Sequence, residues 1–245
     1  MPPGSSSPGA PIRFVLLRPR SAENLGAAAR ALKNFGLSDW SWVAPAGEAE
    51  DPGPARRLAV HAGELLDAAA RPASLAEAIA DCAWVVGTSS RTVPGRRRLS
   101  PHEAAREAVR RAATGAVAVV FGDERSGLTN AEVQRCHALS AVPTCGAQPS
   151  LNLAQAVLLY AYEVRLARLS ASPPPRAPPA APATDADLEQ LRGALLALLE
   201  RGGFLVHPGR HALRDLMTPL LRSALSRKEA RLWMAALSKV ARSLA

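Results

Sequence analysis

Short apolar runs alternate along this chain with segments of helical pattern, and this alternation constrains the fold more than any other feature. The apolar runs are residues 13–17, 40–44, 83–87, 116–121 and 138–142. The helical patterns between and after them cover residues 21–35, 59–70, 75–82, 101–113, 129–137 and 152–169. Strands joined through helices run parallel within one sheet. We therefore predict an α/β fold with a mostly parallel sheet and helices on both of its faces.

A proline-rich stretch divides the chain into two parts. Six of the ten residues from Pro173 to Pro182 are proline, which predicts a semi-extended linker. Helical patterns resume after it over residues 185–201, 211–225 and 227–244. The expected organisation is a disordered tail (1–11), a main α/β domain (12–170), a linker (171–183) and a small helical C-terminal extension (184–245).

Composition limits the partners. The net charge of +9 favours a polyanion such as nucleic acid, although a merely solvated basic surface stays open as the alternative. The three cysteines have no metal-ligand spacing, so we expect no metal and a reducing, cytoplasmic location. No run approaches the roughly 18 apolar residues of a membrane span, and the Pro, Gly and Ser residues at the start do not resemble a signal peptide. We expect no membrane association.

Polar residues gather where three of the apolar runs or loops give way to helical patterns. They lie in residues 24–30, 121–128 and 150–156. Open parallel sheets bind ligands at the carboxyl ends of their strands, so these segments are expected to form one site. Its arginine, asparagines, glutamate, serine and glycines suit a polar cofactor and a phosphodiester, and the usual nucleophile and base are absent.

Each of these residues also has a plain structural interpretation. Arg30 fits an exposed helical arginine, and Asn24 and Arg30 are six residues apart, so they need not share a helix face. Ser150 fits the N-cap of the last long helix, which would place Asn152 just inside that helix, where asparagine has poor propensity and a hydrogen-bonding role is expected. Gly122 fits any tight turn.

A cationic loop is expected over residues 91–98. Its arginines are Arg91, Arg96, Arg97 and Arg98, and they suit either solvent or phosphate contact. The chain lacks a GxxxxGK[ST] phosphate loop and a GxGxxG dinucleotide fingerprint. Residues 87–90 do not form a GxSxG nucleophile motif. Common nucleotide and serine-hydrolase sites are therefore disfavoured.

Four motifs together resemble one known family. They are Asn24-Leu25-Gly26 with Ala29-Arg30-Ala31, then Val86-Gly87-Thr88-Ser89, then Phe121-Gly122-Asp123-Glu124-Arg125-Ser126-Gly127-Leu128, and finally Ser150-Leu151-Asn152-Leu153-Ala154-Gln155-Ala156. This set resembles the SPOUT superfamily of RNA methyltransferases, in its TrmH-like branch that methylates ribose 2′-hydroxyls. Within that branch the chain is most similar to enzymes that modify position 32 of the tRNA anticodon loop. The similarity is continuous over residues 12–168 and weaker beyond residue 185.

The resemblance implies a trefoil knot at the C-terminal side of the sheet, a bound S-adenosylmethionine, a tRNA substrate and a homodimer whose partner completes the site. The residues expected to hold the cofactor are Thr88, Ser89, Ser90, Gly122, Val142, Pro149, Ser150 and Leu151. The expected catalytic residue is Arg30, and the residues expected to organise the site are Asn24, Glu124, Ser150 and Asn152. The residues expected to contact RNA are Arg18, Arg20, Arg91, Arg96, Arg97 and Arg98.

Three departures from the family pattern put the substrate, more than the cofactor, in question. They are the loop at residues 18–23, the segment at residues 144–149 and the proline-rich linker. Methylation of ribosomal RNA or of another tRNA position is therefore the first alternative. A catalytically silent RNA-binding protein on the same scaffold is the second, although Arg30, Glu124 and Asn152 argue against it.

Overall fold

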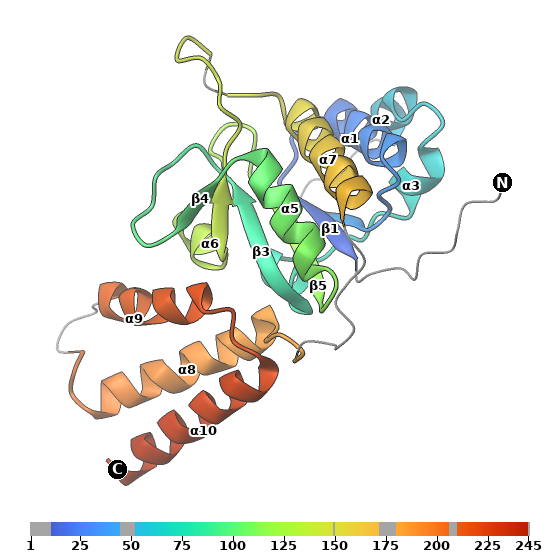
Figure 1. Ribbon diagram of the computed structural model, residues 1–245. Coiled ribbons are helices and arrows are strands. Elements are labelled where there is room, and N and C mark those ends of the chain that lie inside the picture. The colour runs from blue at the N-terminus through green and yellow to red at the C-terminus, as the bar shows by residue number, and fades with distance from the viewer. Residues whose placement is uncertain (1–10, 45–51, 149, 172–179, 206–209, 245) are drawn as a thin grey trace.

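One parallel sheet organises the main part of the molecule (Figure 1). The computed structural model describes residues 11–44, 52–148, 150–171, 180–205 and 210–244. Within these ranges every strand pairing is parallel, in the order β2-β1-β5-β3-β6-β4. The strands are β1 (Ile12–Leu17), β2 (Trp40–Val43), β3 (Cys82–Thr88), β4 (Arg97–Leu99), β5 (Ala116–Phe121) and β6 (Ala138–Ser140). The predicted α/β class is confirmed.

Helices cover both faces of this sheet because side chains alternate along each strand. Phe14 and Leu16 of β1 pack into one apolar layer, and Val15 and Leu17 pack into the other. The helices on the first layer are α1 (Ala22–Asn34), α2 (Pro52–Leu58), α3 (Gly63–Asp67), α5 (Pro101–Arg111) and α7 (Leu153–Ser170). Those on the second are α4 (Leu75–Ala78) and α6 (Asn130–Gln134). The core therefore has two sides, as a buried parallel sheet requires.

Several predicted elements differ from the structure in extent. The pieces of helix expected over residues 59–70 are limited to α3, which begins at Gly63 after His61 takes a positive φ of 60°. The helices expected over residues 75–82 and 129–137 end at Ala78 and Gln134, and Cys82 begins β3. The cationic loop predicted over residues 91–98 ends in a strand, because residues 97–99 pair with β6 as β4 at the edge of the sheet. That strand has two exposed arginines and one buried leucine, too short a pattern to distinguish from a loop.

The C-terminal helices form a separate layer beside the sheet (Figure 1). They are α8 (Asp185–Arg201), α9 (Arg210–Arg222) and α10 (Arg227–Ser243). Leu195 and Leu199 of α8 pack with Met217 of α9 in a small apolar cluster. Asp185 connects this layer to the sheet through an ion pair with Arg135 of the α6–β6 connection. Burial raises the pKa of Asp185 to about 6, although Arg135 acts in the opposite direction.

Several expectations stay predictions. Residues 1–10 of the expected tail and 172–179 of the expected linker lie outside the described residues. The proposed domain boundaries and the trefoil knot are likewise not decided by strand order alone. In the segments that the structure describes, no helix combines the length and apolar character needed to cross a membrane.

A buried histidine joins two central strands. His137 is 6% exposed, and its Nδ1 accepts a hydrogen bond from the backbone N–H of Val85 at 3.1 Å. Burial lowers the pKa of His137 to about 3. The imidazole is therefore neutral in the folded protein at physiological pH.

This histidine predicts a pH-dependent stability. Its pKa is 6.5 in the unfolded chain and lower in the fold, so its contribution is present above pH 6.5 and is lost as the pH falls toward 3. The free energy of unfolding should fall by about 2 kcal/mol between pH 7 and pH 5 because of this residue. His137→Asn retains a hydrogen-bond acceptor but does not titrate, so denaturant unfolding of this variant should lack that share of the pH dependence. An equal pH dependence in both proteins would contradict the assignment.

Candidate active site

The carboxyl ends of the central strands meet at one edge of the sheet. Phe121 at the end of β5 pairs with Leu16 of β1 and with Thr88 of β3. Thr88 pairs in turn with Ser140 at the end of β6. The loops that follow these four strands therefore leave the sheet side by side, at the position where parallel sheets bind ligands.

A cavity of about 300 Å³ lies between the loops that follow β3, β5 and β6. Its lining includes all the described residues that the sequence assigned to the cofactor: Thr88, Ser89, Ser90, Gly122, Val142, Ser150 and Leu151. The remaining one, Pro149, lies outside the described residues. The volume is at the lower end of the range for small-molecule sites.

The turn after β5 forms one wall of this cavity, and it is tight. A Cβ on Gly122 would lie 2.2 Å from the backbone carbon of Gly127, so only glycine fits there. Gly127 itself has a left-handed φ of 66°. Two backbone hydrogen bonds close the turn between Asp123 and Gly127, at 2.8 and 3.1 Å.

Asp123 holds the turn from within, and the sequence analysis missed it. Its carboxylate is 5% exposed and accepts the backbone N–H groups of Arg125 at 2.8 Å and Ser126 at 2.9 Å. Burial alone would raise the pKa of Asp123, yet the hydrogen bonds from Ser126, Arg125 and Arg20 lower it to about 2. Its place directly after the glycine of a strand-to-helix turn was the one available signal, since Asp side chains often bond the amides that follow them.

A chain of hydrogen bonds connects the three segments that the sequence singled out. Asn24 Nδ2 donates to Glu124 Oε1 at 2.7 Å, and Asn24 Oδ1 accepts from Asn152 Nδ2 at 2.9 Å. These residues come from α1, from the turn after β5 and from the start of α7. The predicted convergence of the three segments is therefore present in the structure.

The start of α7 differs from the prediction. The helix begins at Leu153, and its N-cap is Asn152, whose Oδ1 accepts the N–H groups of Ala154 and Gln155. The expectation that Ser150 caps this helix is wrong, because Ser150 lies two residues before the cap and lines the cavity instead. Asn152 thus serves the helix with its oxygen and the site with its amide nitrogen.

Arg30 lies in a second hollow beside the first. Asn24, Arg30, Asn34 and Asn152 are among the residues that line it. Although Asn24 and Arg30 are six residues apart, α1 turns both toward this hollow. The side chain of Arg30 is exposed, and it makes no ion pair or hydrogen bond with any described residue. Asn24 belongs to this hollow and bonds Glu124 of the cofactor cavity, so the two hollows adjoin.

Three hydroxyl side chains, those of Thr88, Ser140 and Tyr160, are among the residues that line the cavity. Thr88 Oγ1 donates to the backbone oxygen of Val120 at 3.1 Å, and Tyr160 donates to Ser140 Oγ at 2.7 Å. Burial raises the pKa of Tyr160 to about 12, so the phenol stays protonated. Ser140 and Tyr160 were not predicted as site residues. Tyr160 lies on the buried face of α7, and nothing in the sequence distinguishes it from an ordinary core residue that does not line a cavity.

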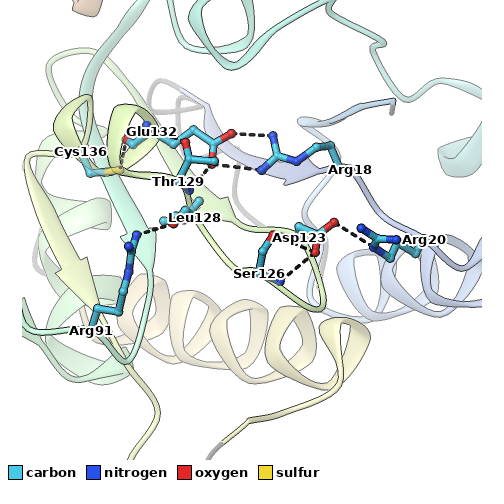
Figure 2. A network of polar contacts seen from close by, with 9 residues as sticks. All are labelled: Arg18, Arg20, Arg91, Asp123, Ser126, Leu128, Thr129, Glu132 and Cys136. Carbon is cyan, nitrogen blue, oxygen red and sulfur yellow. Dashed lines mark hydrogen bonds and ion pairs between the residues drawn. The ribbon is translucent and has the colours of Figure 1, made fainter. Parts of the chain in front are cut away.

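Most arginines expected to contact RNA are engaged within the protein (Figure 2). Arg18 forms a bidentate pair with Glu132, and Arg20 Nε donates to Asp123. Arg91 donates to the backbone oxygen of Leu128.

The remaining three expected RNA contacts differ in exposure. Arg96 is partly buried and donates to the backbone oxygen of Gln134 at 2.9 Å, and burial lowers its pKa. It is therefore not part of an exposed loop, as the sequence suggested. Arg97 and Arg98 are exposed on β4.

The polar side chains around the two hollows are suited to orienting bound molecules and to stabilising charge on them. Amides, hydroxyls, the carboxylates of Glu23, Asp123 and Glu124, and several guanidinium groups, among them that of Arg30, surround the two hollows. No group of three or more His, Cys, Asp or Glu side chains within the described ranges could hold a metal ion.

Known proteins resemble this chain over most of its length. The tRNA (cytidine/uridine-2'-O-)-methyltransferase TrmJ of Cronobacter sakazakii is 39% identical over 218 residues, which cover 84% of this chain and 87% of the relative. Its counterpart in Salmonella typhimurium is 40% identical over 219 residues, covering 84% and 88%. The resemblance to 2′-O-methylating enzymes stated from the sequence is confirmed by these matches.

Solved structures of methyltransferases have the same fold as this chain. The crystal structure of TrmJ from Z. mobilis has a TM-score of 0.80 and 34% identity, and the match covers 94% of this chain and 99% of that one. A probable methyltransferase from Bordetella pertussis has a TM-score of 0.59 and 36% identity over 64% of this chain and 96% of its own. The model of the SpoU rRNA Methylase family matches residues 11–162, which contain the whole sheet and both hollows. This chain therefore belongs to the SpoU rRNA methylase family.

Proposed function

We propose that this protein transfers a methyl group from S-adenosylmethionine to the ribose 2′-hydroxyl of a cytidine or uridine in tRNA, at position 32 of the anticodon loop. The observation that carries the proposal is the hydrogen-bonded chain Glu124–Asn24–Asn152, which connects the cofactor cavity to the hollow of Arg30. The names of the TrmJ relatives support the tRNA substrate and the 2′-oxygen as acceptor.

The cavity residues fit this cofactor. Ser89 and Ser90 offer hydroxyl groups at the end of β3, while Val142 and Leu151 offer apolar contact. The absent Cβ of Gly122 lets a ligand approach the backbone of the turn. When bound, S-adenosylmethionine supplies an electrophilic methyl group on a sulfonium, so the protein itself needs no nucleophile.

Arg30 is assigned to the RNA side of the site. Negative charge develops on the ribose oxygen as its proton leaves, before the oxygen attacks the methyl group and the carbon–sulfur bond breaks, and an unpaired guanidinium stabilises such charge. A guanidinium stays protonated at physiological pH, so Arg30 holds charge and position rather than accepting the proton. The hydroxyl proton goes to a phosphate oxygen of the substrate or to water. The hydrogen bonds among Glu124, Asn24 and Asn152 fix the position of the cofactor cavity relative to the hollow of Arg30.

A homodimer is the proposed functional form. Along α7 an exposed apolar stripe includes Leu158, Tyr162, Leu166 and Leu169, which recur at helical spacing. A stripe of this kind on a packed helix is typical of an interaction surface. We assign it to a second copy of the chain, whose residues would complete the RNA side of the site.

The proposal gives the main domain and the C-terminal helices different roles. Residues 12–170 catalyse and dimerise, and residues 184–245, with ten Lys or Arg against six Asp or Glu, help to hold tRNA.

Cys82, Cys136 and Cys145 are free thiols, which fits the reducing cytoplasm. The family description names ribosomal RNA, and rRNA is therefore the second candidate substrate.

Mapping the modified nucleotide tests the proposed activity. Purified protein is incubated with labelled S-adenosylmethionine and either tRNA or rRNA transcripts that lack 2′-O-methyl groups, and the products are analysed by mass spectrometry. We expect one methylated ribose at position 32 of tRNA. Methylation of rRNA alone would transfer the assignment to the second candidate, and binding of RNA without cofactor binding would indicate a silent scaffold.

Arg30→Lys tests the catalytic assignment. Lysine retains the charge but loses the planar fork of donors, so the single-turnover rate should fall by roughly 100-fold while S-adenosylmethionine binds as before. Arg106→Lys is the matched control, because Arg106 is an exposed helical arginine that lines neither hollow. A wild-type rate in Arg30→Lys would show that Arg30 does not stabilise the forming charge.

Leu166→Glu tests the dimer. A charge within the apolar stripe should convert the protein to a monomer in light-scattering measurements, because an unpaired carboxylate is costly to bury. Leu232→Glu, at an exposed leucine of α10, should leave the mass unchanged. A wild-type protein that is monomeric at micromolar concentration would overturn this part of the proposal.

A further inference from the structure

The turn between Gly122 and Leu128 is held from outside by arginines of other segments (Figure 2). Arg18 and Arg20 come from the loop between β1 and α1, and Arg91 comes from the loop after β3. All three donate to acceptors in the turn or in α6, which follows it, and the side chains of Arg20 and Arg91 are at the same time partly open to solvent (Figure 2). This arrangement assigns a purpose to the unusual sequence at residues 18–23, which the proposed function does not explain.

The contact of Arg20 completes the bonding of Asp123. Asp123 Oδ1 accepts the two backbone N–H groups of the turn and the hydroxyl of Ser126. Its other oxygen, Oδ2, accepts Arg20 Nε at 3.0 Å. A buried carboxylate oxygen without a partner is strongly unfavourable, and Arg20 prevents that state.

The first turn of α1, directly after this loop, contacts the next residue of the turn. Asn24, four residues after Arg20, donates to Glu124, which directly follows Asp123. Arg20 and Asn24 therefore hold two consecutive residues of the turn, the buried Asp123 and the exposed Glu124, both of which line the cavity. A displacement of Asp123 would move Glu124 and the cavity wall with it.

Arg18 and Arg91 hold the following segment. Arg18 donates to both carboxylate oxygens of Glu132, at 2.5 and 3.1 Å. Glu132 also completes the capping box of α6 with Thr129. Arg18 makes this pair from a left-handed backbone with φ of 51°, a conformation that costs a non-glycine residue free energy. Arg91 donates to Asn130 at 3.0 Å, at the start of α6.

We propose that Arg18 and Arg20 are positioning residues for the cofactor cavity, and that their ion pairs with Glu132 and Asp123 hold its turn in the binding conformation. The cations of the loop between β1 and α1 thus serve cofactor binding, whereas Arg97, exposed on β4, is assigned to phosphate. This inference rests on the proposed function, since it names the same cofactor.

Replacing Arg20 with glutamine separates the two roles. Glutamine Nε2 occupies the same place along the side chain as arginine Nε, so Arg20→Gln keeps the donor to Asp123 and removes the charge. Arg20→Ala removes both. Arg97→Ala is the control for an exposed arginine of β4, at the edge of the sheet.

Three measurements distinguish the outcomes. Hydrogen exchange of the Ser126 and Gly127 amides without ligand reports the turn itself, calorimetry reports S-adenosylmethionine affinity, and filter binding over a salt series reports tRNA affinity. Arg20→Ala should speed the exchange and weaken S-adenosylmethionine binding by about tenfold, with tRNA affinity within twofold of wild type. Arg20→Gln should regain most of the cofactor affinity, and Arg97→Ala should weaken tRNA binding only and reduce its salt slope by about one.

Two results would overturn the inference. One is Arg20→Ala protein that binds S-adenosylmethionine as tightly as wild type. The other is a loss of tRNA affinity with a smaller salt slope in both Arg20 variants, which would make Arg20 a phosphate contact. If the wild-type protein does not bind S-adenosylmethionine, the proposed function itself fails, and the exchange measurement still decides whether Arg20 holds the turn.

Discussion

The amide of Asn24 is the interaction on which the rest of the site depends. It donates to Glu124 and accepts from Asn152, so one side chain connects segments that are 100 and 128 residues away in sequence. An amide can satisfy both partners only in one orientation, since Glu124 requires its nitrogen and Asn152 requires its oxygen. The start of α7 and the turn after β5 are thereby fixed relative to α1.

The packing around this amide leaves room for ligands on both sides. Gly26 of α1 lies so close to α2 that a Cβ would meet the backbone oxygen of Ala55 at 2.0 Å. Gly122 allows an equally close approach within the turn after β5. The close backbone contacts at these two glycines position α1 and the turn. The hydrogen-bonded chain of Glu124, Asn24 and Asn152 lies between the cofactor cavity and the hollow of Arg30. The division suits a reaction in which the methyl donor and the nucleic acid approach from different sides.

Much of this arrangement could be predicted from the sequence because it is local. The strand-to-helix order identified the parallel sheet, and the N-caps Ser21 and Thr129 are the first residues of two of the predicted helical patterns. The lining of the cavity followed from the family motifs. Asn152 was assigned a hydrogen-bonding role on propensity alone, although its position as the N-cap was attributed to Ser150.

The parts that the sequence analysis missed depend on distant partners. Arg20 and Asp123 are 103 residues apart, and Arg18 and Glu132 are 114 apart. Nothing in the neighbourhood of either arginine shows that its charge is neutralised, so both were assigned to RNA. β4 was missed for the same reason, because its three residues become a strand only by pairing with β6.

Asn152→Asp tests most directly whether the polar chain organises catalysis. Aspartate caps a helix as well as asparagine, so the melting temperature should stay within a few degrees of wild type, while the missing Nδ2 donor releases Asn24. We expect the single-turnover rate of methyl transfer to tRNA to fall at least tenfold, with cofactor still bound. A stable Asn152→Asp protein that transfers methyl groups at the wild-type rate would show that the polar chain does not organise catalysis.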